Sequence, residues 1–357
     1  MSPKEIAWKL HNRIAGVPPK PSVLLNMEAE VAAGRPKNAA RMALAHPNFI
    51  NIVMKNWVKS WSNRDQSNRV DFNDHSATLL GIIRDDIGFD QALYGDIYYT
   101  VNGSATAWAN NSNDHYRVAE SSRMDLNANL VKEVQSARLL PAAAVSGVIT
   151  TRQGAEAFIQ AGTNRRINRF TFMNFLCNDY EQLHDITVSD VHVGRDVDRA
   201  PGGDSRTYKN KCVGCHAGQD AMRGAYAYYD YSGNTITYTP GVVVNKINKN
   251  VLYSSGKMTV NDSWENLWAL PNTQNQNKLQ FQGVNSGNGA KSLNMHLARS
   301  KGFANCMAKK VFELVCMKEP VNTDDKVFVE AQARAFESSY GYKIKDLVVE
   351  TSVGCIK

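Results

Sequence analysis

Five consecutive residues of this chain have the types and spacing needed for covalent cofactor chemistry. Cys212-Val213-Gly214-Cys215-His216 follows the pattern C-x-x-C-H, which is typical of c-type haem attachment. In such a site two thiols form thioethers with the haem vinyl groups, and the adjacent imidazole is the proximal iron ligand. A redox dithiol needs no histidine after it, and a zinc site needs a second ligand pair at close spacing. The motif predicts one covalent haem c on Cys212, Cys215 and His216.

The second axial ligand determines what such a haem does. A methionine or histidine there gives a six-coordinate electron carrier, whereas an open position permits chemistry on small molecules. Met258 follows the motif in an expected loop, and we expect it to bind the iron opposite His216. Core packing is the commoner fate of a methionine. If the iron were open instead, His184 or His192 would be candidates for an acid–base residue in peroxidase- or oxygenase-type chemistry.

Charged and aromatic side chains flank the motif. Arg195 and Arg199 precede it and could hold the haem propionates through bidentate hydrogen bonds. Pairing with the neighbouring Asp196 and Asp198 is an equal alternative. The tyrosines that follow the motif could wall a haem pocket, although ordinary core packing would bury them too. These are Tyr226, Tyr228, Tyr229 and Tyr231.

Four cysteines remain outside the motif: Cys177, Cys306, Cys316 and Cys355. Covalent haem attachment implies export, and an even remainder in an exported chain predicts two disulfides. Residues 303–317 are expected to form a helix, which would separate Cys306 from Cys316 by about 15 Å, too far for a disulfide. If the last three helices run up, down and up, Cys355 ends near Cys316. We therefore expect the pairs Cys316–Cys355 and Cys177–Cys306.

The N-terminal segment has no secretion signal, because Lys4, Lys9 and Arg13 interrupt every apolar run. We expect a periplasmic or extracellular protein shown without its leader. The net charge of +7 favours acidic partners. The basic residues are scattered and lack the pattern expected for nucleic acid.

The chain of 357 residues is long enough for two domains. We expect a helical N-terminal domain at 1–140 and a haem-binding domain at 141–357. No stretch of 18 apolar residues exists, which argues against a membrane-spanning helix. Apolar periodicity predicts helices near 6–14, 36–46, 49–57, 76–84, 89–97, 151–161, 167–181 and 303–317. Loops are expected at 98–113 and 191–205, and a small hairpin within 234–244.

Three segments around the motif resemble a known family. Residues 212–233, CVGCHAGQDAMRGAYAYYDYSG, are similar to the pattern C-x-x-C-H-x-x-M-D-P-L-G of planctomycete-type cytochrome c-like modules in large exported bacterial proteins. The segments 145–177 and 300–320 resemble the helices on either side of the motif in that family. Gln219 and Ala221 replace its Met and Pro, and Lys318-Glu319 replaces a Gly-Arg pair, while Asp220 is kept. The resemblance implies an exported monohaem c-type cytochrome and little about its role.

The sequence therefore predicts a mainly α protein: a helical N-terminal region and a cytochrome c-like haem module with a small β-hairpin. The expected function is single-electron transfer to a redox partner protein, which could be acidic. The alternatives are a haem enzyme with an open distal site, and a structural cytochrome that forms a homo-oligomer or filament. One haem in 357 residues is sparse for a dedicated carrier, which favours the alternatives.

Overall fold

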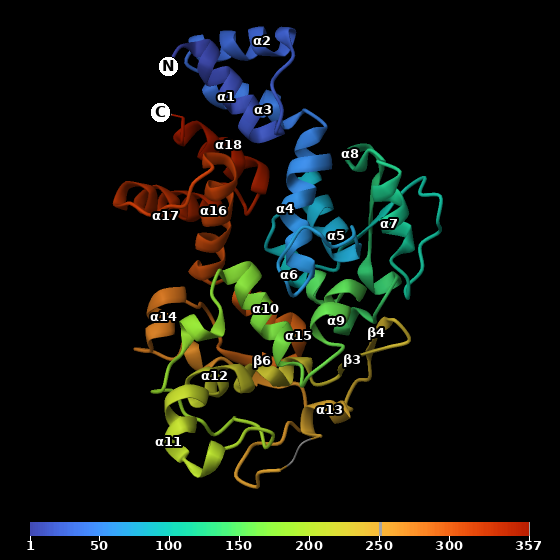
Figure 1. Ribbon diagram of the computed structural model, residues 1–357, viewed down its shortest axis with the longest axis vertical. Helices are drawn as coiled ribbons and strands as arrows, with labels where there is room; N and C mark the ends of the chain where they lie inside the picture. Colours follow the sequence, from blue (N-terminus) through green and yellow to red (C-terminus); the bar gives the residue numbers. More distant parts are fainter. Residues whose placement is uncertain (250–251, 357) are drawn as a thin grey trace.

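The computed structural model describes residues 1–249 and 252–356, and helices dominate it (Figure 1). Its strands, within those residues, form three two-stranded antiparallel sheets. The expectation of a mainly α protein with a small β-hairpin is confirmed. The architecture does not by itself identify a cytochrome c-like module.

Helices from both ends of the chain pack together at the top of Figure 1. α1 contacts α2, α3 and α18, and α18 also packs on α3 and α16. The bounds are α1 (Pro3–Ala15), α2 (Pro21–Ala32), α3 (Pro36–Leu44), α16 (Lys301–Cys316), α17 (Thr323–Ser338) and α18 (Ile344–Gly354). A capping box of Ser2 and Glu5 begins α1, satisfying two otherwise free N–H groups. The buried face of α1 confirms the expected amphipathic helix.

The middle of the chain forms short helices around one strand pair. Its elements are η1 (Phe49–Met54), α4 (Lys55–Lys59), η2 (Ser60–Ser62), α5 (Asp74–Arg84), α6 (Gln91–Tyr94), β1 (Tyr98–Val101), α7 (Asp114–Ser121), α8 (Leu126–Asn129), β2 (Leu130–Glu133), η3 (Gln135–Ala137), η4 (Ala142–Ala144) and η5 (Gly147–Thr150). β1 pairs with β2, Tyr98 opposite Glu133.

Three local expectations need correction in this region. The expected helix at 49–57 begins as the π-helical turn η1 before continuing as α4. The expected helix at 89–97 is only the single turn α6, because Gly95 is already extended. Within this turn the Asp90 carboxylate accepts a hydrogen bond from the Tyr94 hydroxyl. The expected loop at 98–113 begins as strand β1, whose partner lies far along the chain.

The remaining elements surround the cysteine motif. They are α9 (Arg152–Phe158), α10 (Arg165–Leu176), η6 (Tyr180–Leu183), η7 (Pro201–Gly203), α11 (Ser205–Thr207), η8 (Tyr208–Cys212), α12 (Val213–Arg223), η9 (Gly224–Tyr226), β3 (Tyr229–Ser232), β4 (Thr235–Tyr238), α13 (Asn245–Asn248), β5 (Ser263–Glu265), η10 (Leu267–Ala269), α14 (Gln274–Leu279), β6 (Ser286–Asn288) and α15 (Gly289–Ala298). The hairpin lies earlier than expected, because the tyrosine-rich run supplies strand β3. Its two-residue turn has positive φ at both Gly233 and Asn234, as a type I′ turn requires.

One continuous cluster of buried apolar side chains extends from Ala7 to Ile356. α6 packs against α15 and η5, and the Ser146 hydroxyl donates to the carbonyl of Leu93 at 2.9 Å. Buried contacts therefore cross the expected boundary at residue 140. The division into two domains there stays a prediction.

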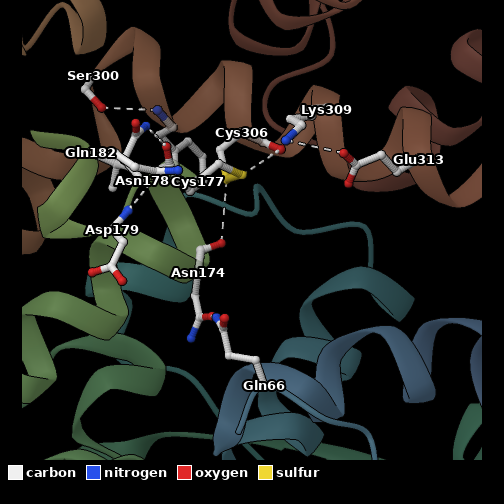
Figure 2. Close-up of a disulfide and its surroundings, with 12 residues drawn as sticks. Gln66, Asn174, Cys177, Asn178, Asp179, Gln182, Ser300, Cys306, Lys309 and Glu313 are labelled. Atoms are coloured by element: carbon white, nitrogen blue, oxygen red, sulfur yellow. Dashed lines mark hydrogen bonds and ion pairs between the residues drawn. A yellow bond between two sulfur atoms is a disulfide. The ribbon is translucent and has the colours of Figure 1, made fainter. Parts of the chain in front are cut away.

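Two disulfides tie the C-terminal helices to each other and to α10. The Cα atoms of Cys177 and Cys306 are 5.2 Å apart, and those of Cys316 and Cys355 are 5.6 Å apart. Figure 2 shows the first bridge, where the end of α10 meets α16. Both expected pairs are confirmed. Disulfides are typical of chains that mature in an oxidising compartment.

Among the helices of residues 1–249 and 252–356, none is long and apolar enough to cross a membrane.

Candidate cofactor-attachment site

The C-x-x-C-H motif lies where η8 passes into α12, in the lower part of Figure 1. Helical residues three and four apart share a face, so the side chains of Cys212, Cys215 and His216 leave the helix on one side. All three residues are partly exposed, whereas Val213 and Ala217 between and after them are buried. The three reactive groups therefore line the surface edge of an otherwise buried helix.

The two motif cysteines are free thiols, since the other four form the disulfides. Cys215 Sγ lies 3.3 Å from the carbonyl oxygen of Tyr180. Burial raises the pKa of the Cys215 thiol. Two neighbouring sulfurs thus remain available for thioether formation.

A buried carboxylate holds the His216 imidazole. His216 Nδ1 lies 3.4 Å from Oδ1 of Asp220, one turn further along α12. Arg165 donates to Asp220 through Nε at 2.5 Å and Nη2 at 2.7 Å, and the Gly194 N–H donates at 2.8 Å. Burial alone would raise the pKa of Asp220, but the Arg165 guanidinium holds that pKa well below its usual range. An ionised acceptor therefore faces His216.

Sequence reasoning missed Arg165, which organises this site. Arg165 is the first residue of α10 and also pairs with Asp196, whose carboxylate lies 3.5 Å from Arg223. A positive charge at a helix N-terminus opposes the helix dipole, so an arginine there calls for a nearby carboxylate. An arginine at the expected start of a helix is therefore the sequence signal that could have pointed to Arg165 and its carboxylate partners.

The structure gives Arg195 and Arg199 other partners. Arg195 Nε donates to the carbonyl of Gly256 at 3.0 Å, and its Nη1 lies 3.4 Å from Met258 Sδ. Arg199 pairs with Asp190 at 2.8 Å. Pairing of these arginines with Asp196 and Asp198, the local alternative, is wrong. Asp196 pairs with Arg165 and Arg223, and Asp198 accepts a hydrogen bond from the Ala200 N–H at 2.8 Å. Contact of Arg195 and Arg199 with propionates stays a prediction.

Met258 lines a cavity of about 260 Å³ beside α12. Asp220 also lines this cavity, and so do His192 and Glu265, whose Nε2 and Oε2 atoms are 3.3 Å apart. His216 is not part of the lining. The structure thus brings Met258 and His192 together but does not place Met258 opposite His216. Iron ligation by Met258 stays a prediction.

His184 packs against the backbone of the motif. A Cβ atom at Gly214 would lie 2.6 Å from the His184 ring, and the Asp185 N–H donates to the Gly214 carbonyl at 3.0 Å. A larger residue at Gly214 would have to displace the His184 ring, so this ring packs directly on the first turn of α12.

Two of the four tyrosines after the motif take the core-packing alternative. Tyr226 and Tyr229 are fully buried. The Tyr226 hydroxyl donates to Asn294 at 3.2 Å, and that of Tyr229 donates to the carbonyl of Ala144 at 2.8 Å. Their hydroxyl groups are satisfied by hydrogen bonds to other buried residues.

The expectation of a metal-binding protein must be corrected. Within residues 1–249 and 252–356, no three His, Cys, Asp or Glu side chains gather into a group that could hold a metal ion. The structure thus displays no iron or haem site, and describing the chain as an iron-binding cytochrome on structural grounds is wrong. Covalent attachment is a separate question, because a haem brings its own iron and needs two thiols and an imidazole from the protein. That donor set is present at Cys212, Cys215 and His216.

Taken together, fold and site define a mainly helical, disulfide-bonded protein whose C-x-x-C-H motif is partly exposed and has two free thiols. Comparisons with protein-family models, with curated proteins and with solved structures each found no match. The resemblance to planctomycete-type cytochrome c-like modules therefore stays a prediction.

Proposed function

We propose that this chain is a monohaem c-type cytochrome of the periplasm or extracellular space that transfers single electrons. One observation carries the proposal: of six cysteines, four form disulfides, and the two left free are those of the C-x-x-C-H motif. They lie on the same side of α12 as His216 and are partly exposed. The haem would be held by thioethers to Cys212 and Cys215, with His216 as axial ligand.

When bound, haem supplies a reversible one-electron step between ferrous and ferric iron. The residues of this chain hold and orient it: the thiols fix its edge, His216 offers a nitrogen, and Asp220 holds the other imidazole nitrogen. Lys209 and Lys211 are exposed beside Cys212. Their positive charges would steer an acidic redox partner to this edge.

Two observations favour a second candidate function, a haem enzyme with an open distal position. Met258 Sδ is already engaged by Arg195, which leaves it less free to bind iron. The cavity beside Asp220 contains the His192–Glu265 pair, which could act as acid and base on a small molecule.

Covalent loading tests the proposal directly. The full chain is exported in a host with haem-ligation machinery, and its intact mass and pyridine haemochrome spectrum are measured. We expect one haem per chain, and none in the double variant Cys212→Ala/Cys215→Ala. The matched control Cys316→Ala/Cys355→Ala also lacks two cysteines but keeps the motif, so it should retain haem. A wild-type chain without covalent haem would overturn the proposal.

The spectrum of the loaded protein separates the two candidate functions. A low-spin spectrum with a band at about 695 nm and no carbon monoxide shift indicates a methionine ligand. Loss of that band in Met258→Ala would then assign it. A high-spin spectrum that shifts with carbon monoxide would reject Met258 and favour the enzyme.

A further inference from the structure

A buried network of four charges lies behind the imidazole of His216. Its members are Arg165, Asp196, Asp220 and Arg223. Withdrawing charges from water is costly, so such a network is weak evidence for stability alone. Its contact with the motif histidine suggests another use.

The geometry restricts where the His216 proton can be. Asp220 Oδ1 lies 3.4 Å from His216 Nδ1, and both oxygens of that carboxylate accept from Arg165. An ionised carboxylate can only accept, so a hydrogen bond in this pair requires the proton on Nδ1. The Gln219 amide is the competing donor, at 3.5 Å from the same Nδ1. The two distances are nearly equal, but a hydrogen bond to an ionised carboxylate is about twice as strong as one between neutral groups, so charge favours the Asp220 partner.

We propose that Asp220, held by Arg165, is a positioning residue that keeps the His216 proton on Nδ1 and leaves Nε2 free to bind iron. Carboxylate partners of this kind fix the tautomer of a ligating histidine and raise its basicity. A more basic ligand stabilises the ferric state, so Asp220 would lower the reduction potential. The proposal rests on the proposed function for its redox consequence, but not for the tautomer.

The tautomer is measured first, in the haem-free full chain, from ¹⁵N chemical shifts of the His216 ring when it is neutral. We expect protonated Nδ1 in the wild type and a shift toward protonated Nε2 in Asp220→Asn. The matched control Asp196→Asn removes the other carboxylate on Arg165 and should keep the wild-type tautomer. Protonated Nε2 in the wild type overturns the proposal, even if Asp220→Asn fails to fold. Equal shifts in both variants also overturn it.

The loaded protein then tests the redox consequence. Asp220→Asn should carry as much haem as the wild type and show a higher midpoint potential, while Asp196→Asn keeps the wild-type value. An unchanged potential in Asp220→Asn rejects the effect on the iron. A wild-type chain that carries no haem would reject the proposed function, while the tautomer result would still stand.

Discussion

His75 on α5 is fully buried, and this gives the protein a specific pH dependence. Burial lowers the pKa of His75 to about 3, against about 6.5 in an unfolded chain. Between these values the unfolded state binds more protons, so the free energy of unfolding falls as the pH falls. His296 contributes with the same sign, because burial lowers its pKa to about 4.

We predict that His75→Gln flattens this dependence. Below pH 6.5 each such histidine contributes a slope of roughly 1 kcal/mol per pH unit, and the variant loses one of them. Urea unfolding between pH 7 and pH 5 measures the slope. An identical slope in the variant and the wild type would show that His75 takes up its proton at the same pH in the folded and the unfolded protein, which contradicts the lowered pKa.

Gly218 allows α12 to pack closely against Trp268. A Cβ atom there would lie 2.1 Å from Cε2 of Trp268, a fully buried side chain. Gly218→Ala should therefore destabilise the protein by about 1–3 kcal/mol through overpacking. Urea unfolding measures the loss, with the exposed Lys211→Ala as control. A variant as stable as the wild type would mean that α12 can shift away from Trp268.

Among the helices, the two disulfides should contribute unequally to stability. Cys177–Cys306 closes a loop of 129 residues and Cys316–Cys355 one of 39. The chain-entropy relation gives about 5 and about 4 kcal/mol respectively. Paired alanine variants compared by urea unfolding should therefore lose more stability for the first bridge. A larger loss for Cys316–Cys355 would mean that strain or residual structure outweighs loop entropy.

Local patterns in the sequence predicted the longer helices, and one of those helices excluded a pairing of Cys306 with Cys316. The apolar periodicity of α1, α5 and α16 persists because each helix buries one stripe. Cys306 and Cys316 are too far apart along α16 to pair with each other, so each needs a partner outside this helix. Strand β1 was missed because its partner β2 is distant in the sequence: even the nearest pair, Val101 and Leu130, is 29 positions apart. The run Tyr98–Val101, YYTV, has β-prone residues but gives no hint of that partner.

The candidate site was predicted only where its members are close in sequence. Cys212, Cys215 and His216 came from one motif, whereas Arg165 reaches Asp220 from 55 residues away. Likewise, the cavity at Met258 depends on how β5 and the preceding loop pack on α12. Such contacts depend on tertiary packing, which periodicity and motif spacing do not encode.

On the scale of the whole molecule, the continuous core predicts one cooperative unit. α1 and α3 cover α18, and α5 and α6 pack against α9 and α15. We expect residues 141–357 expressed alone to lack a sharp urea transition and to bind a hydrophobic dye, because those faces lose their cover. The full chain is the control. A cooperative transition in the fragment would instead support the expected boundary at residue 140.

The packing of α1 on α18 brings the first and last helices side by side (Figure 1). The chain could therefore be joined at that point and cut at another without moving either helix. A short flexible linker could join the two helices, and new ends could be opened at the exposed turn of Gly233 and Asn234, since circular permutation succeeds mainly at such loop tips. The permuted chain would keep the C-x-x-C-H motif unbroken. Its new ends would lie at the turn between β3 and β4 and no longer beside α1 and α18.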